Sequence, residues 1–352
     1  MCSGWLKSDK RAPDWQGGAG AVFRSDQVEL RKGIAMSNFH VAVFGGGSVG
    51  LALAVHFAKA GARVSLLVRK ASMVALQNAP IEISGALGEH SIPEGAIAIV
   101  DAADPDDAVL CSDMLVLTTK AYDVAAALAP FAGRTTVPSI LLLQNGIGAA
   151  EIARDVLGAD VSVFSTAMMI GMVRHAPGKT EITGIAGPIC CGTLSGDDAG
   201  PLHDMLAVAQ GGFVPMVYDP KIRETIAFKL LFNACMNPTG ALTGQTYGEL
   251  LANPASRALI AGLADEALAA FAAAFDYRPA QSGQQYVQET LDAIVGKGAG
   301  KHRSSMLQDL QAGRQTEIAF LNGAIIKMAT DAGLQAPRHE TVRQLIWVRE
   351  TS

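Results

Sequence analysis

The sequence has few charged residues, few aromatic residues and no block of basic residues. Asp, Glu, Lys and Arg make up 17% of its 352 residues, aromatic residues 6%, and the formal net charge is −5. A mildly acidic chain without a basic cluster lacks the charge that neutralises phosphates, which argues against nucleic acid as a partner. Hydrophobic residues reach 49%, enough for a large core and too many for a disordered chain.

Cysteine is also scarce, with Cys2, Cys111, Cys190, Cys191 and Cys235 scattered along the chain and no CxxC pair among them. This spacing is typical neither of a disulfide framework nor of a zinc site. We therefore expect no bound metal and a reducing, cytoplasmic location.

Long hydrophobic runs are scarce as well. The two most apolar segments, 226–242 and 258–275, are interrupted by polar residues such as Lys229 and Asp265. We expect no membrane-spanning helix. Residues 1–35 contain no apolar run of the length that a secretory signal needs.

The length and the hydrophobic pattern predict two domains after a leader. Residues 1–36 show no regular period and are interpreted as a disordered leader or a mis-assigned start, with Met36 as initiator, the alternative being a partner-binding arm. Residues 37–219 alternate short apolar strands with helices, which predicts an α/β Rossmann-like dinucleotide-binding domain with a parallel sheet. Residues 220–352 have a helical pattern, which predicts an all-α C-terminal domain for substrate binding and catalysis, with the boundary near 218–221.

A glycine-rich turn follows the first predicted strand and opens a helix. It reads Gly45-Gly46-Gly47-Ser48-Val49-Gly50, and a second strand follows at 63–69. In this context the glycines predict a tight turn, a close backbone approach to a pyrophosphate and close packing of helix on strand. The alternative is an ordinary glycine-rich turn.

The end of the second strand indicates which dinucleotide binds. An NAD enzyme carries an acidic residue there for the ribose 2′-hydroxyl, whereas this chain has Arg69 and Lys70. Because an arginine can hold a 2′-phosphate through two N–H groups, we expect NADPH rather than NADH. A solvated surface arginine is the alternative.

Two further polar residues, Lys120 and Asn145, each follow an apolar strand. Ligands of open α/β sheets bind outside the carboxyl ends of the strands, so both residues are candidate cofactor contacts. Their alternatives are a lysine that extends to solvent and an Asn-Gly turn.

The helix predicted at 222–237 has a polar stripe on an apolar background. Lys229, Asn233 and Asn237 are spaced at i, i+4 and i+8 and lie on one face. Since buried polar groups need hydrogen-bond partners, the stripe predicts a wet cleft. A helix with one thin solvated face is the alternative.

Two residues further on complete the candidate set. Ser305 is expected to cap a helix, with Gln308 as its capping-box partner, a role compatible with binding a substrate carboxylate. Glu317 lies among apolar residues, and the spacing of twelve residues does not put it on the same helix face as Ser305.

Together these segments resemble the ketopantoate reductase family (2-dehydropantoate 2-reductase), over about residues 39–345. The motifs are the glycine turn with Arg69, Thr119-Lys120-Ala121, Gln144-Asn145-Gly146, and residues 229–238 and 304–318. The resemblance implies that Lys229 is the general acid and that Glu317 organises it and contacts the cofactor. It also implies that Asn233, Asn237 and Ser305 bind the substrate and that Arg69, Lys120 and Asn145 bind NADP. One departure is Tyr247, where some members have Asn before Gly-Glu.

The expected activity is NADPH-dependent reduction of a small 2-oxo acid, foremost 2-dehydropantoate to (R)-pantoate in pantothenate biosynthesis. Tyr247 keeps open a D-2-hydroxy-acid dehydrogenase of the same family that acts on branched or aromatic 2-oxo acids. A non-catalytic NADP(H)-binding sensor is a third hypothesis, disfavoured by the intact set of polar residues. A homodimer is an open alternative for the quaternary structure.

Overall fold

The protein is seen in a computed structural model that describes residues 38–134 and 139–352. The leader expected at 1–36 lies outside the described residues. The chain divides into two compact units, one ending at Ile226 and the other beginning at Ala227. This division falls inside a single helix, a few residues after the boundary expected at 218–221.

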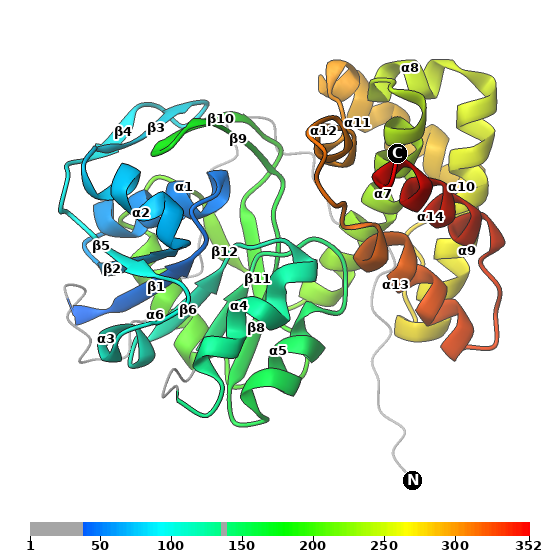
Figure 1. Ribbon diagram of the computed structural model, residues 1–352. Coiled ribbons are helices and arrows are strands. Elements are labelled where there is room, and N and C mark those ends of the chain that lie inside the picture. The colour runs from blue at the N-terminus through cyan, green and yellow to red at the C-terminus, as the bar shows by residue number, and fades with distance from the viewer. Residues whose placement is uncertain (1–37, 135–138) are drawn as a thin grey trace, which may run out of the picture. The chain divides into compact units, whose positions relative to one another are not determined.

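An eight-stranded sheet forms the centre of the first unit, with the strand order β12-β11-β8-β7-β6-β1-β2-β5 (Figure 1). Neighbouring strands are parallel from β5 to β8 and antiparallel between β8 and β11. The strands are β1 (His40–Phe44), β2 (Arg63–Val68), β5 (Ala98–Asp101), β6 (Met114–Leu117), β7 (Ser139–Leu142), β8 (Ser162–Ala167), β11 (Ile189–Thr193) and β12 (Met216–Tyr218). The Rossmann-like α/β prediction is confirmed.

Helices cover both faces of this sheet, because alternate side chains of its strands point to opposite sides. Val41 and Val43 of β1 pack in one buried cluster with α1 and α6, whereas Ala42 and Phe44 pack in the other with α3, α4 and α5. The helices are α1 (Ser48–Lys59), α2 (Lys70–Gln77), α3 (Asp107–Leu110), α4 (Val124–Leu128), α5 (Ala149–Leu157) and α6 (Gly200–Ala209). Burial on both faces explains why the strands read as continuous apolar runs.

A second, four-stranded sheet packs against α1 in the order β4-β3-β10-β9. It joins β3 (Ile81–Gly85) and β4 (His90–Ile92) to the hairpin of β9 (Ile170–Ala176) and β10 (Lys179–Ile185). The strands near 81–92 were not predicted, because they are short and carry polar residues on their exposed side. Residues 170–218 contain β9, β10, β11, β12 and α6.

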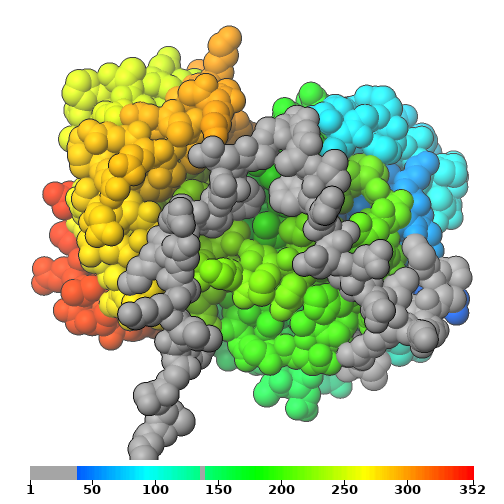
Figure 2. Space-filling model, turned by 180° about the vertical axis from the view of Figure 1, so that it is seen from behind, coloured from blue at the N-terminus to red at the C-terminus, as the bar shows by residue number. Residues whose placement is uncertain are grey.

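The second unit is helical throughout the described range 227–352, as predicted. Its helices are α7 (Ile222–Thr243), α8 (Tyr247–Ala252), α9 (Pro254–Phe275), α10 (Gly283–Gln285), a π-helical turn at Tyr286–Leu291, α11 (Asp292–Gly296), α12 (Ser305–Gln311), α13 (Ile318–Asp331) and α14 (Pro337–Glu350). The π-helical turn lies between α10 and α11. The yellow α9 and the orange residues that follow it adjoin on the face seen in Figure 2.

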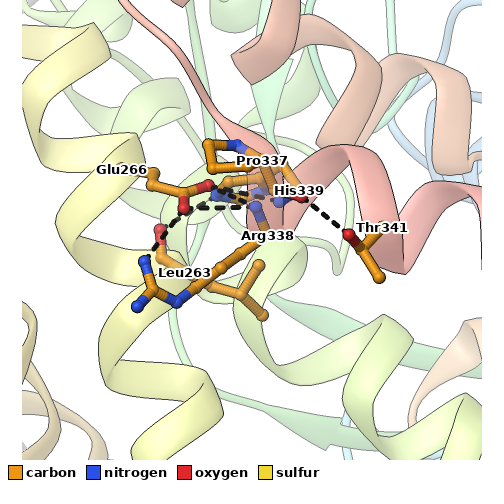
Figure 3. Close-up of polar contacts among 6 residues, drawn as sticks. All are labelled: Leu263, Glu266, Pro337, Arg338, His339 and Thr341. Carbon is orange, nitrogen blue, oxygen red and sulfur yellow. Dashed lines mark hydrogen bonds and ion pairs between the residues drawn. The ribbon is translucent and has the colours of Figure 1, made fainter.

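The helix α9 is long and apolar enough to cross a membrane by length and composition, which corrects the expectation that no segment is. Its two carboxylates are nevertheless used within the helical unit. Asp265 accepts a hydrogen bond from the backbone N–H of Gly283. Glu266 binds the Arg338 side chain and the N–H groups of Arg338 and His339 (Figure 3). Half of the apolar window of α9 is buried, so α9 packs as a core helix.

Candidate functional site

The glycine turn between β1 and α1 is shaped by contacts that side chains would block. Gly45 has a φ of +120°, a conformation that residues with a Cβ rarely adopt. A Cβ on Gly50 would overlap the Gly45 carbonyl, whereas a Cβ on Gly47 would meet no atom within 4 Å. Gly47 caps α1 without a side-chain hydrogen bond. No side chain caps the start of α1, and a helix N-terminus of this kind fits a bound phosphate.

Arg69 directly follows β2 and precedes the first residue of α2. It is exposed. An acidic residue does lie near the end of β2, because Asp101 of β5 pairs with Val68 in the sheet. The Asp101 carboxylate accepts a hydrogen bond from the Ala103 backbone N–H, 3.0 Å away. The sequence did not reveal this carboxylate, because Asp101 is far from Arg69 along the chain. It lies on the neighbouring strand and does not replace Arg69.

Lys120 and Asn145 follow the carboxyl ends of β6 and β7, which are adjacent parallel strands. Both side chains are half-buried. The buried Gln144 joins the two loops, because its side-chain amide donates to the carbonyls of Leu117 and Thr119, each at 3.0 Å. This role of Gln144 was not predicted from the sequence. Since β6 also pairs with β1, both loops share the sheet edge with the glycine turn.

The helix α7 continues to Thr243 although Pro238 lies inside it. Proline has no N–H and leaves the carbonyl four residues earlier without its helical donor. Asn322 of α13 supplies that donor, with its side-chain nitrogen 3.1 Å from the Ala234 carbonyl. The same nitrogen lies 2.9 Å from His339 Nδ1. The signal for this role was present in the sequence, since a proline within a helix requires a replacement donor.

The polar stripe of α7 is a narrow, partly exposed strip on a helix that is otherwise buried. Between Thr225 and Ala241, all of which are described, only Lys229, Phe232 and Asn233 are not fully buried. Lys229 and Asn233 are half-buried, and Asn237 is 4% exposed. A helix with a freely solvated face would leave more of these side chains exposed, so the burial pattern favours a confined polar surface.

Asn237 is held by the first residue of α8 and by the residue that precedes α12. The hydroxyl of Tyr247 donates to Asn237 Oδ1 at 2.9 Å, and the hydroxyl of Ser304 donates to the Asn237 carbonyl at 3.1 Å. The Tyr247 ring packs edge-on against Phe232, with ring centroids 5.4 Å apart. Burial raises the pKa of the Tyr247 hydroxyl above its ordinary range, so it remains a donor.

The cap of α12 is Ser304 rather than Ser305, which corrects the expected capping box. The Ser304 hydroxyl accepts from the Leu307 N–H at 3.2 Å. Gln308 donates to the Arg303 carbonyl instead of closing a box. Ser304 is buried against α7, whereas Ser305 is the exposed first residue of α12. The Ser305 hydroxyl is therefore not used as the cap.

Glu317 is 6% exposed and immediately precedes α13. Ser305 begins α12, whereas Glu317 precedes α13. Their separation of twelve residues therefore does not determine whether the two side chains face the same way. Asn322 fixes α13 against α7 through Ala234, one residue after Asn233. The structure thus attaches the helix that begins after Glu317 to the helix that bears Lys229.

These features define a class of protein: an enzyme with a Rossmann-type dinucleotide-binding unit and a helical unit that carries a lysine and two asparagines on one face. Family models described as "Ketopantoate reductase PanE/ApbA" and "Ketopantoate reductase PanE/ApbA C terminal" match residues 41–196 and 221–350. The chain belongs to the ketopantoate reductase family, which confirms the resemblance. It is an oxidoreductase of a dinucleotide-dependent family.

Known relatives cover nearly the whole described chain. The 2-dehydropantoate 2-reductase of Aquifex aeolicus is 27% identical over 312 residues, which are 88% of this chain and 96% of that protein. A PanE/ApbA family ketopantoate reductase from Ralstonia eutropha JMP134 has a TM-score of 0.76 at 22% identity, over 89% of this chain and 99% of its own. D-mandelate dehydrogenase with NADH and anilino(oxo)acetate also has a TM-score of 0.76, at 20% identity and the same coverage. The two structures show the shared fold.

Proposed function

We propose that this protein reduces a small 2-oxo acid with NADPH, foremost 2-dehydropantoate to (R)-pantoate. The observation on which the proposal rests is the half-buried stripe of Lys229 and Asn233 on a helix whose neighbouring residues are nearly all buried. The curated relative from Aquifex aeolicus bears the name of this reaction. We assign the reaction to pantothenate biosynthesis and to the cytoplasm, where cysteines that form no disulfide, such as Cys191 and Cys235 among the described residues, are stable.

The glycine turn fits a dinucleotide, because the missing Cβ atoms of Gly45 and Gly50 permit the tight turn and a Cβ on Gly47 would project into open space that a ligand can occupy. The N–H groups at the start of α1 would hold the pyrophosphate, and Arg69 the 2′-phosphate. Lys120 and Asn145, at the same sheet edge, would contact the ribose and nicotinamide half. When bound, the cofactor supplies a hydride to the ketone carbon of the substrate.

The chain's own residues would handle the charge and the proton. As the ketone becomes an alcohol, negative charge develops on its oxygen, and the Lys229 ammonium stabilises that charge and donates the proton. Asn233 and Asn237 would orient the substrate by hydrogen bonds, and Ser305 would bind its carboxylate. Glu317 would hold the lysine in position and contact the cofactor.

A second candidate substrate class is favoured by one observation. By the resemblance, Tyr247 stands where some family members have asparagine, and its buried ring packs on the half-buried Phe232 beside the stripe. An aromatic wall of this kind suits a branched or aromatic 2-oxo acid, and one structural relative is D-mandelate dehydrogenase. The candidate activity is then that of a D-2-hydroxy-acid dehydrogenase.

The test is a comparison of kcat/KM for NADPH oxidation with 2-dehydropantoate, 4-methyl-2-oxopentanoate and phenylglyoxylate. The foremost proposal expects the highest kcat/KM with 2-dehydropantoate. A higher value with either bulky acid would support the dehydrogenase instead. Absence of turnover with all 2-oxo acids would contradict both and favour a non-catalytic NADP(H) sensor.

A further inference from the structure

A hollow in the α/β unit adjoins the glycine turn, close to the end of β2. Three segments line it: Gly46 of the turn, the beginning of α2 with Ala71 and Ser72, and the β9–β10 hairpin with Arg174 and Gly178. The hairpin is part of the small sheet, and its Arg174 lies 128 residues after Gly46 of the glycine turn in the sequence. The hollow therefore combines the dinucleotide-binding motif with a segment outside it.

Arg174 extends from β9 to the glycine turn. Its Nη1 donates a hydrogen bond to the Gly46 carbonyl, 3.1 Å away. The guanidinium has five N–H groups, and this contact uses one of them. The side chain is exposed, so the remaining donors are accessible to a ligand in the hollow.

Other charged side chains of the hairpin form ion pairs, and Arg174 differs from them. On the same hairpin, His175 pairs with Glu181 at 2.7 Å and Lys179 pairs with Glu82 at 2.8 Å. Within residues 38–134 and 139–352, no carboxylate lies within ion-pair distance of Arg174. Its positive charge is thus uncompensated at short range, which suits an anionic ligand.

Arg69 lies near the same hollow. It follows Val68, whose side chain would be 2.8 Å from a Cβ on Gly46, and it precedes Lys70, Ala71 and Ser72 at the start of α2. Gly46 is therefore in contact with the end of β2 on one side and with Arg174 on the other. A phosphate held by Arg69 beside Gly46 would lie within the range of a long arginine side chain from β9.

We propose that Arg174 is a second arginine for the 2′-phosphate of NADP(H), which makes it a specificity-determining residue supplied by the small sheet. This inference rests on the proposed use of NADPH. Arg69 and Arg174 together would hold the phosphate from the β2 end and from the hairpin. A phosphate monoester carries up to two negative charges, and two guanidinium groups match it in charge and in hydrogen-bond donors.

The test uses two cofactor fragments, 2′,5′-ADP and 5′-AMP, which differ only in the 2′-phosphate. Their Kd values are measured by isothermal titration calorimetry for the full chain and for Arg174→Gln, Arg174→Lys and Lys179→Gln. Lys179→Gln removes one positive charge from the same hairpin but not from the hollow, so it controls for the general electrostatic field. Melting temperatures establish that each variant is folded.

We expect Arg174→Gln to weaken 2′,5′-ADP at least tenfold, which corresponds to about 1.4 kcal/mol, and to change 5′-AMP less than twofold. Arg174→Lys should be intermediate, and Lys179→Gln should change neither fragment more than twofold. Unchanged binding of 2′,5′-ADP in Arg174→Gln would overturn the inference. Equal weakening of both fragments would also overturn it, since Arg174 would then only brace the glycine turn.

The parent protein separates this inference from the proposal on which it rests. If the parent binds 2′,5′-ADP more tightly than 5′-AMP but Arg174→Gln keeps that preference, only the role proposed for Arg174 is wrong, and the proposed use of NADPH stands. If the parent shows no preference, the proposed use of NADPH fails and the inference fails with it.

Discussion

The side-chain nitrogen of Asn322 lies 3.1 Å from the carbonyl oxygen of Ala234 and donates to it the hydrogen bond that Pro238 cannot provide. The proline thus creates a free acceptor in the middle of α7, and α13 is fixed to α7 at that point. This arrangement attaches the chain that follows Glu317 to the helix of Lys229. The integrity of the proposed site therefore depends on a residue outside it.

Replacing Asn322 by alanine should destabilise the protein by about 1–3 kcal/mol, because a buried carbonyl loses its partner. The measurement is urea unfolding. Pro238→Ala restores a backbone N–H to Ala234, so Asn322→Ala should cost about 1 kcal/mol less in that background. Identical costs in both backgrounds would show that the two residues are not coupled.

Buried histidines should make the protein less stable in mild acid. Burial lowers the pKa of His339 from 6.5 to about 4. Its Nε2 lies 2.9 Å from the Leu263 carbonyl (Figure 3). Its Nδ1 lies 2.9 Å from the Asn322 nitrogen, and the two contacts together fit a neutral ring. Burial lowers the pKa of His56 to about 4 as well.

Because the unfolded chain protonates first, the stabilising contribution is complete above pH 6.5 and is lost as the pH falls toward about 4. From pH 8 to pH 5, His339 alone should account for a loss of roughly 2 kcal/mol. The check is the free energy of unfolding at several pH values for the parent and for His339→Gln. An equal pH dependence in both proteins would exclude His339 as a source.

Arg69 should determine a large part of the cofactor preference. A hydrogen bond to a charged group contributes about 1.5–3 kcal/mol, or roughly one to two decades in affinity. Arg69→Ala should therefore weaken NADPH by that factor and leave NADH nearly unchanged, as measured by fluorescence titration. Arg134→Ala, another exposed arginine of the same unit, is the control. Equal use of NADPH and NADH by the parent would contradict the assignment.

Tyr247 should act through Asn237. Tyr247→Phe removes the hydroxyl bonded to Asn237 Oδ1 but keeps the ring against Phe232. We expect kcat/KM to fall about tenfold, the equivalent of one hydrogen bond of ~1.4 kcal/mol, with little change in NADPH affinity. Steady-state kinetics and fluorescence titration measure the two quantities. An unchanged kcat/KM would show that Asn237 needs no such support.

The main sheet and the glycine turn could be predicted because the sequence patterns that indicate them are local. Apolar runs such as Met114–Leu117 and the glycines at 45–50 need only neighbouring residues for their interpretation. The helical character of the second unit was also predicted, but the contacts between its helices were not. Ser304, Asn322 and Gln144 act through residues 25 to 88 positions away, and such partners are not visible in a local pattern. The cap of α12 was misplaced by one residue because two serines adjoin and only burial distinguishes them.

The central claim is that Lys229 protonates the substrate, and kcat of Lys229→Ala measured beside NADPH affinity tests it most directly. Positioned proton transfer contributes about 10²–10⁴ in rate, so kcat should fall by that factor while the affinity, which we assign mainly to the glycine turn and Arg69, stays within a few-fold. Lys229→Arg should not restore the rate, because arginine is a very poor proton donor at neutral pH. Lys327→Ala, an exposed lysine paired with Asp331, is the control and should retain full activity. A kcat for Lys229→Ala within a few-fold of the parent would contradict the account, since the proton would then come from another group.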